Sequence, residues 1–235
     1  MKHLTGNTWI VVVVVAAMAP FYAFGDNHGV GKSDAEAPGF RCPYTVQTCP
    51  VMGTDLGSMG EPIAVMHEGR EVHLCCQACV TKFNENPEKY LEKVDELTVE
   101  MQKPMYPLDT CVVSGEKLGG MGEPVDHVYE NRLVRLCCAG CVATFDKDPG
   151  KYLAKIDAAV IEKQKDSYPL DTCLVSGRTL AEGKAVDQVV GTRLVRFCGS
   201  GCVDAFNKNP AKYLAKLDGA CKAACDKGAV SSCPM

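Results

Sequence analysis

The stretch Val134-Arg-Leu-Cys-Cys-Ala-Gly-Cys141 occurs, with few changes, three times in this chain. Its counterparts are Val72-His-Leu-Cys-Cys-Gln-Ala-Cys79 and Val195-Arg-Phe-Cys-Gly-Ser-Gly-Cys202. A Thr-Cys dipeptide lies upstream of each copy, and a Phe, a Pro and a Lys-Tyr-Leu motif follow each. The upstream cysteines Cys49, Cys111 and Cys173 are a constant 62 residues apart. Such a period indicates a repeat architecture, so we interpret residues 48–219 as three copies of one small module.

Each copy predicts a β-hairpin followed by two helices. Short apolar and β-branched runs at 71–74, 133–136 and 194–197 predict strands, and Gly69, Asn131 or Gly191-Thr192 just upstream is typical of a tight hairpin turn. The cysteine pair is expected to open a short helix, and a proline marks the first turn of a longer one. The predicted fold class is therefore α+β, as three tandem small modules of a hairpin, a short helix and a longer connecting helix.

The N-terminal segment predicts an exported protein. Lys2, an apolar run from Ile10 to Ala19 and small residues before Asp26 are typical of a cleaved secretory signal peptide. The run is about ten residues long, against the roughly 20 that span a bilayer. We therefore expect a periplasmic or secreted protein with no stable membrane span after cleavage, or a membrane-tethered one if the segment is retained. The predicted segments are a signal peptide at 1–25, a flexible leader at 26–41, repeats at 42–104, 105–166 and 167–220, and a cysteine-containing tail at 221–235.

Each repeat can bring three sulfur atoms to one point. Residues i and i+4 share a face of a helix, so Cys75 and Cys79 are expected to aim at one position, with loop residue Cys49 adding a third sulfur. Three converging thiolates suit a thiophilic ion such as zinc or copper. In repeats 1 and 2 a doubled cysteine offers a fourth ligand, whereas repeat 3 has Gly199 there. The candidate metal ligands are Cys49, Cys75, Cys76, Cys79, Cys111, Cys137, Cys138, Cys141, Cys173, Cys198 and Cys202.

This pattern resembles the YHS/TRASH class of small metal-binding domains. The Cys-x3-Cys pair, the phenylalanine and the Lys-Tyr-Leu motif of each copy match, and the likeness extends over residues 48–219. The resemblance implies treble-clef-like modules and a role in heavy-metal sensing, trafficking or resistance, copper handling included. Members of the class often carry a cysteine directly before the loop glycine, where this chain has Met52, Ser114 and Ser176. They also usually carry a serine after the first hairpin cysteine.

The cysteines admit other arrangements as well. In an exported protein the triads could form disulfides, each worth ~2–4 kcal/mol, and an odd total of 15 cysteines leaves one thiol over. The loop cysteine belongs to its own repeat if the family pattern holds. Cys111 also follows directly on repeat 1 and could instead complete the site of Cys75 and Cys79. Cys221 suits burial as a small apolar residue. Cys221 and Cys225 are again i and i+4, and with Cys42 or Cys233 they are candidates for a fourth thiol cluster or a terminal disulfide.

Composition and motifs narrow the function. A net charge of −4 argues against a nucleic-acid partner, and no Ser-His-Asp spacing, phosphate loop or dinucleotide fingerprint is present. We predict a non-enzymatic exported protein that binds copper or zinc for storage or trafficking, with the metal ion and a metal transporter or another exported protein as partners. Two alternatives stay open. One is a disulfide-stapled scaffold for protein binding, and the other a thiol–disulfide redox protein using the Cys76/Cys79 or Cys138/Cys141 spacing.

Overall fold

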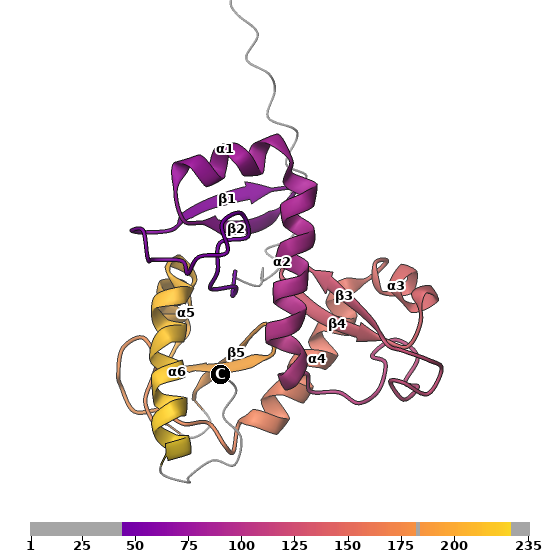
Figure 1. Cartoon of the computed structure of the whole chain (residues 1–235). Coiled ribbons are helices and arrows are strands. Elements are labelled where there is room, and N and C mark those ends of the chain that lie inside the picture. Colours follow the sequence, from indigo (N-terminus) through magenta and orange to yellow (C-terminus); the bar gives the residue numbers. More distant parts are fainter. Residues whose placement is uncertain (1–43, 182–183, 227–235) are drawn as a thin grey trace, which may run out of the picture. The chain divides into compact units, whose positions relative to one another are not determined.

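The computed structural model describes residues 44–181 and 184–226, and over these ranges the chain is α+β (Figure 1). Three two-stranded hairpins are each followed by two helices, as predicted from the repeats. The elements are β1 (Ile63–His67), β2 (Arg70–Leu74), α1 (Gln77–Glu85), α2 (Pro87–Gln102), the 3-10 turn η1 (Lys103–Met105), β3 (Val125–Tyr129), β4 (Arg132–Leu136), α3 (Ala139–Phe145), α4 (Pro149–Gln164), β5 (Val186–Val190), β6 (Arg193–Phe197), α5 (Ser200–Lys208) and α6 (Pro210–Asp226). The predicted signal peptide, the leader and the end of the tail lie outside the described residues.

Tight two-residue turns close the three antiparallel hairpins. In the first hairpin His67 pairs with Arg70, and the intervening Glu68 and Gly69 both have positive φ, at 47° and 82°. The second turn has the same form, and Gly191 in the third has φ 62°. Such turns match the right-handed twist of paired strands. The second strand of each hairpin therefore begins one residue earlier than its apolar run indicates.

The short helices begin after the cysteine pair, which corrects the predicted register. Helix α1 starts at Gln77, and its N-cap residue Cys76 has extended backbone with φ −163° and ψ 167°. Cys75 therefore lies in the bend between β2 and α1, and only Cys79 is on the helix. An N-cap residue takes non-helical dihedrals because the chain is still turning into the helix there. The same offset occurs at Cys138 and Gly199.

The longer helices begin as predicted, at a proline. Pro87 is the first residue of α2, where its missing N–H costs no helical hydrogen bond. The Asn86 side chain caps this helix by accepting a hydrogen bond from the Lys89 backbone N–H at 3.3 Å. Asp148 and Asn209 cap α4 and α6 in the same way. This local chemistry sets the sharp turn between the short and long helix of every repeat.

Three buried clusters, one centred on each repeat, form the apolar interior. The phenylalanine of each short helix, Phe83, Phe145 or Phe206, is fully buried within its cluster. Each of these rings also lies 6.0–6.4 Å from the tyrosine ring of the following helix. The three clusters include cysteines of the predicted sites. The side chains that hold each repeat together therefore also hold its thiols.

A glutamine at the end of each of the first two long helices, buried at Gln102 and half-buried at Gln164, joins the helix to the next hairpin. The Gln102 amide donates to the Asn131 carbonyl oxygen at 2.9 Å and accepts from the Leu133 backbone N–H at 2.9 Å. Gln164 repeats both bonds on the third hairpin, each at 2.8 Å. These side chains bind a backbone carbonyl of the turn and a backbone N–H on the outer edge of the second strand, where a two-stranded sheet offers no further strand.

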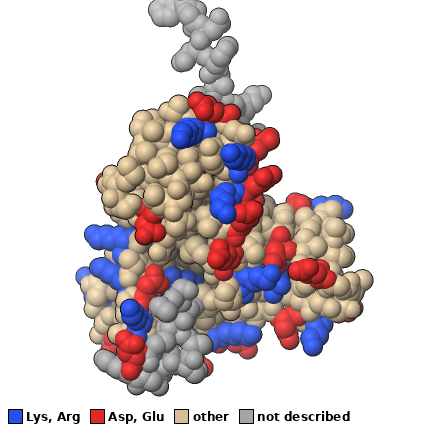
Figure 2. All heavy atoms as spheres, in the orientation of Figure 1, with Lys and Arg blue, Asp and Glu red and all other residues tan. Residues whose placement is uncertain are grey.

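The surface carries charges of both signs, interspersed over the face shown in Figure 2. Recurrent ion pairs join each second strand to its own long helix, as between Arg70 and Asp95 at 2.5 Å. Arg132 with Asp157 and Arg193 with Asp218 form the equivalent pairs. Within residues 44–181 and 184–226, no helix combines the length and the apolarity needed to cross a bilayer.

Candidate metal centres

A short glycine-containing loop fixes the first cysteine of each repeat. The Cys49 backbone N–H donates to the Thr54 carbonyl oxygen at 2.8 Å, and the Gly53 N–H donates back to the Cys49 carbonyl oxygen at 2.7 Å. Gly53 has φ 70°, a left-handed conformation that other residues rarely adopt. Gly115 and Gly177 have φ 80° and 70° in the corresponding loops. The turn presents the loop cysteine to the inside of the repeat, where it is fully or almost fully buried.

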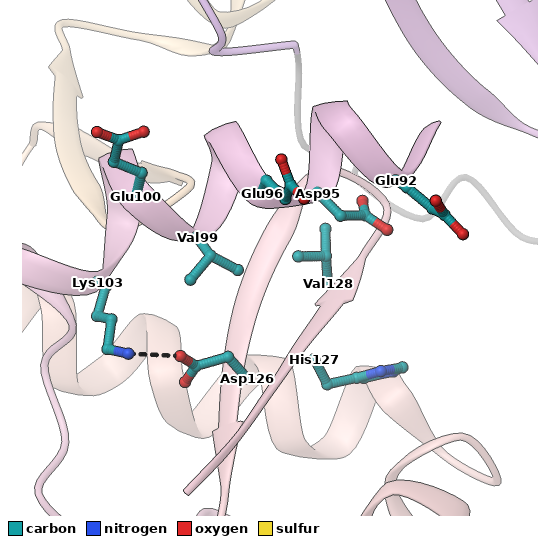
Figure 3. A pocket seen from close by; sticks show the side chains of 9 residues that line it. All are labelled: Glu92, Asp95, Glu96, Val99, Glu100, Lys103, Asp126, His127 and Val128. Carbon is teal, nitrogen blue, oxygen red and sulfur yellow. Dashed lines mark hydrogen bonds and ion pairs between the residues drawn. The ribbon is translucent and has the colours of Figure 1, made fainter. Parts of the chain in front are cut away.

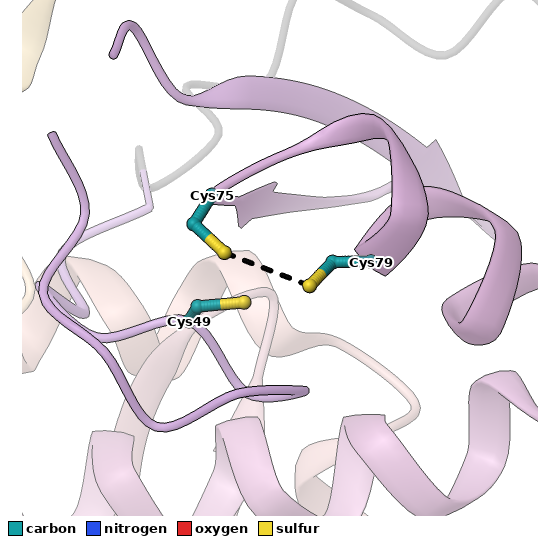
Figure 4. Close-up of side chains that lie close together, drawn as sticks. All are labelled: Cys49, Cys75 and Cys79. Atoms are coloured by element: carbon teal, nitrogen blue, oxygen red, sulfur yellow. Dashed lines mark hydrogen bonds between the residues drawn. The ribbon is translucent and has the colours of Figure 1, made fainter. Parts of the chain in front are cut away.

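The three cysteines of repeat 1 converge from three different elements (Figure 4). Cys49 comes from the loop, Cys75 from the end of β2 and Cys79 from the first turn of α1. The Cys75 and Cys79 Sγ atoms are 3.5 Å apart, and all three Sγ atoms lie within 4.8 Å of one another. A zinc–thiolate bond of about 2.3 Å gives a sulfur–sulfur edge of about 3.8 Å in a tetrahedral site. The spacing of the sulfurs thus suits one shared ion.

Repeats 2 and 3 assemble the same group, and each loop cysteine joins the pair of its own repeat. This is the intra-repeat arrangement that we preferred from the sequence. No histidine or carboxylate belongs to any of these groups in the described part of the chain, and the twelve cysteines described there with their side chains are free thiols. The three thiol triads are Cys49, Cys75 and Cys79; Cys111, Cys137 and Cys141; and Cys173, Cys198 and Cys202.

The doubled cysteines lie beside the triads. Cys76 Sγ is 4.0 Å from Cys75 Sγ and 3.7 Å from Cys79 Sγ. In repeat 2, Cys138 Sγ lies 3.9 Å and 3.8 Å from the corresponding sulfurs. Both residues are half-buried, and neither belongs to the group whose sulfurs all lie close together. Each lies beside two of the three sulfurs of its triad and is more exposed than those two cysteines.

The loop cysteines are the acidic thiols of the triads. Burial acts to raise the pKa of Cys111, but the Ser114 hydroxyl and several backbone N–H groups outweigh it and lower this pKa to about 6. The pKa of Cys173 is lowered to about 6 in the same way, with Ser176 in place of Ser114. Backbone N–H groups also lower the pKa of Cys49 against the effect of burial. Each loop cysteine thus ionises more easily than the helix cysteine of its triad, whose pKa is raised.

The helix cysteines show the opposite shift. Burial, together with the neighbouring cysteines, raises the pKa of Cys141 to about 12, and the pKa values of Cys79 and Cys202 are raised for the same reasons. A second negative charge beside the loop thiolate is unfavourable when nothing positive balances it. The metal-free triads therefore favour one thiolate accompanied by neutral thiols. A cation at the centre would reverse this preference and release protons.

A serine hydroxyl at two of the triads is a feature that the sequence reasoning missed. Ser114 Oγ lies 3.3 Å from Cys137 Sγ, and Ser176 Oγ lies 3.3 Å from Cys198 Sγ. These serines occupy the position directly before the loop glycine, which the sequence marked only as a departure from the family pattern. Repeat 1 has the half-exposed Met52 there. The recurrence of serine directly before the loop glycine in repeats 2 and 3 was the sequence signal that could have revealed this contact.

The remaining cysteines stand apart from the triads. Cys221 is 6% exposed in the core cluster of repeat 3, which confirms the prediction that it is buried as a small apolar residue. The backbone of Cys225 belongs to α6, but its side chain is not described. Cys42 and Cys233 lie outside the described residues, so the proposed terminal cluster stays a prediction.

A groove between α2 and β3 carries different chemistry (Figure 3). Several of its carboxylates already have cationic partners. Asp126 lies 2.8 Å from Lys103 Nζ, and Asp95 is paired with Arg70. No thiol lines the groove. Its lining residues are Glu92, Asp95, Glu96, Val99, Glu100, Lys103, Asp126, His127 and Val128.

A scan of protein-family models finds no match to this chain, and neither does comparison with curated proteins or with solved structures. The function is therefore inferred from the chemistry of the three triads.

Proposed function

We propose that this chain is an exported, non-enzymatic protein that binds a thiophilic metal ion at each of its three thiol triads. The ion belongs to the copper or zinc class, and its binding serves storage or trafficking. The resemblance to YHS/TRASH domains and their treble-clef-like modules supports this proposal from the sequence side. Export is supported by the signal-like residues 1–25.

One observation carries the proposal: three sulfurs meet at one point three times over, each time from a loop, a strand end and a helix. Burying several thiols together gains little if packing is the only purpose, because a cysteine buries no more than a small apolar side chain. Soft sulfur ligands at tetrahedral-edge spacing are what zinc and copper(I) sites require.

In repeats 1 and 2 we propose that Cys76 and Cys138 supply the fourth sulfur. Their sulfurs lie 3.7–4.0 Å from the two paired cysteines, close to the edge of about 3.8 Å of a tetrahedral four-sulfur site, although neither belongs to the group that includes the loop cysteine. Repeat 3 has Gly199 at this position and offers three sulfurs. The expected stoichiometry is one ion per repeat in all three cases.

The test is metal analysis and mass spectrometry of the full chain purified without oxygen. We expect three ions per chain with free thiols, and the loss of one ion in each of the variants Cys79→Ser, Cys141→Ser and Cys202→Ser. Cys221→Ser is the matched control, because Cys221 is a buried free cysteine outside the triads, and it should keep all three ions. Fully paired cysteines and no metal would overturn the proposal in favour of the disulfide scaffold.

The redox alternative has one observation in its favour. Cys76 is half-buried, lies 3.7 Å from Cys79 and has a lowered pKa because backbone N–H groups at the start of α1 stabilise its thiolate. These are properties of reactive cysteines. The same experiment separates the two functions, since a redox protein would show a Cys76–Cys79 disulfide and no stoichiometric metal.

A further inference from the structure

The three triads differ in how they are covered. Cys75 and Cys79 are 3% and 1% exposed, and their counterparts in repeat 2 are 5% and 9% exposed. In repeat 3, Cys198 and Cys202 are only half-buried, although the loop cysteine of that triad is as buried as the others. The difference coincides with position 199, where glycine replaces the doubled cysteine of the first two repeats.

Neither the backbone nor the packing requires a glycine at this position. Gly199 has φ 173° and ψ 168°, an extended conformation that any residue adopts, and Cys138 has nearly the same backbone with φ −161° and ψ 165°. A Cβ atom placed on Gly199 would meet no atom within 4 Å. A cysteine would therefore fit here as it does in repeats 1 and 2. The structural consequence of the glycine is that no fourth sulfur lies beside the triad of repeat 3, whose Cys198 and Cys202 are half-buried.

Metal sites with a complete set of protein ligands are typically structural and closed, whereas sites that react with an outside molecule keep one coordination position open. In repeats 1 and 2 a fourth sulfur, that of Cys76 or Cys138, lies 3.7–4.0 Å from two of the three triad sulfurs. Repeat 3 has three sulfurs and access from solvent. The chain thus combines two triads that have a fourth sulfur beside them with one triad that has none and whose Cys198 and Cys202 are half-buried.

We propose that repeat 3 is the exchange site, at which an exogenous thiolate binds the ion held by Cys173, Cys198 and Cys202 and takes it over. The inference rests on the proposed metal-binding function. A first thiolate would form a bond to the ion at the open position, and each further thiolate would replace one cysteine, whose freed sulfur takes up the proton that the incoming thiol releases. No electron is transferred. The thiolate comes from a low-molecular-weight thiol or from a cysteine of an acceptor protein.

The experiment uses the full chain loaded with cadmium, whose NMR resonance reports the number of bound sulfurs at each site. Two thiols are added in separate arms: glutathione, and a folded protein with a single exposed cysteine. We expect the resonance of repeat 3 alone to shift. A shift with glutathione only assigns the small thiol as the ligand, and a shift with the protein thiol as well admits an acceptor protein.

The matched variants exchange the residue after the first cysteine of the pair between repeats 2 and 3. Gly199→Cys should abolish the response of repeat 3, and Cys138→Gly should give repeat 2 the response that repeat 3 has in the original chain. Cadmium release to a chelator should be slowed roughly 10-fold or more at repeat 3 by Gly199→Cys and accelerated as much at repeat 2 by Cys138→Gly. Even outer-shell changes alter metal affinity by roughly 10–100-fold.

Two kinds of failure can be told apart. If no cadmium binds to the triads, the proposed function fails and this inference fails with it. A different outcome is that three ions bind but all three sites respond to thiols alike, or that Gly199→Cys and Cys138→Gly leave the responses of repeats 3 and 2 unchanged. In either case the metal-binding function stands and the assignment of repeat 3 as the exchange site is overturned.

Discussion

The two ends of each hairpin have different roles. At the turn end, the glutamine of the preceding helix binds the same two backbone groups in both junctions, with bond lengths of 2.8–2.9 Å. At the cysteine end, the triad is constant but its surroundings vary. The residue after the first cysteine of the pair is Cys76, Cys138 or Gly199 in the three repeats. The residue before the loop glycine is Met52, Ser114 or Ser176. The framework between repeats is thus kept while the environment of each metal centre changes.

This contrast has a physical reason. The backbone groups at the turn end are buried in the second hairpin and partly buried in the third, so the loss of their partners is costly and few side chains suit that position. At the cysteine end the covering residues lie nearer to solvent, and a change there alters reactivity more than stability. The comparison can be tested at both ends.

The largest expected effect is at the turn end. Gln102→Ala removes both partners of buried backbone groups on the second hairpin, the Asn131 carbonyl and the Leu133 N–H. An unsatisfied buried group costs about 1–3 kcal/mol, so we expect a loss of roughly 2–4 kcal/mol in the free energy of unfolding. Urea unfolding of the full chain followed by circular dichroism measures it.

Gln164→Ala is the matched variant. The bonds of Gln164 are 2.8 Å long, against 2.9 Å for those of Gln102, but they are only partly buried, so water can replace the lost partner more easily. We expect a smaller loss, of about 1–2 kcal/mol. Both variants should keep three metal ions per chain at temperatures where they stay folded. A loss of metal without a loss of stability would contradict the separation of the two ends.

The repeat pattern predicts much of the fold and the members of each triad. The 62-residue period, the prolines of the long helices and the turn residues Gly69, Asn131 and Gly191 all depend on local chemistry, and the structure has them where the sequence places them. The intra-repeat grouping of Cys49 with its neighbours also follows the preferred sequence interpretation. The signal peptide, the domain boundaries and the family assignment stay predictions.

The features that the sequence did not predict depend on contacts between residues that are far apart in the chain. The i, i+4 spacing of Cys75 and Cys79 suggested one helix face, but the sulfurs meet because Cys75 lies in a bend before the helix. Gln102 belongs to no motif that the sequence analysis identified, and its role depends on the second hairpin being packed against it. The contact of Ser114 with Cys137 likewise requires the loop and the strand end to be together.

A second prediction concerns pH and acts at the cysteine end. In the metal-free, reduced chain the pKa values of Cys111 and Cys173 are about 6, against an ordinary value of 9.0. Between these values the unfolded chain binds more protons than the folded one, so stability rises with pH from about 6 to 9. The pKa of Cys141 is raised to about 12, so the folded chain holds its proton longer and stability falls again between 9 and 12.

Urea unfolding at a series of pH values, with a reductant and a chelator present, should therefore show a maximum near pH 9. In the double variant Cys111→Ser, Cys173→Ser the rise between pH 6 and 9 should become much weaker, while the fall at alkaline pH remains. A flat profile in the original chain over the acid side of the maximum would show that the loop thiols are not acidic in the fold.

The smallest effect isolates one hydroxyl. Ser114→Ala removes the side-chain hydrogen bond that lowers the pKa of Cys111, and backbone N–H groups remain as the chief lowering influence, as they are for Cys49 in repeat 1. We expect the pKa of Cys111 to rise toward that of Cys49. Cysteine Cβ chemical shifts followed by NMR against pH resolve the individual thiols.

The reverse change, Met52→Ser, places a hydroxyl at the same loop position of repeat 1. Met52 is 53% exposed, so its replacement removes little packing. If the hydroxyl is what distinguishes the loops, the pKa of Cys49 should fall while that of Cys111 stays unchanged in this variant. Equal titration of Cys49 before and after the change would assign the acidity of the loop cysteines to backbone N–H groups alone. The differences at the cysteine end would then lie in the covering residues Cys76, Cys138 and Gly199, and not in the loop.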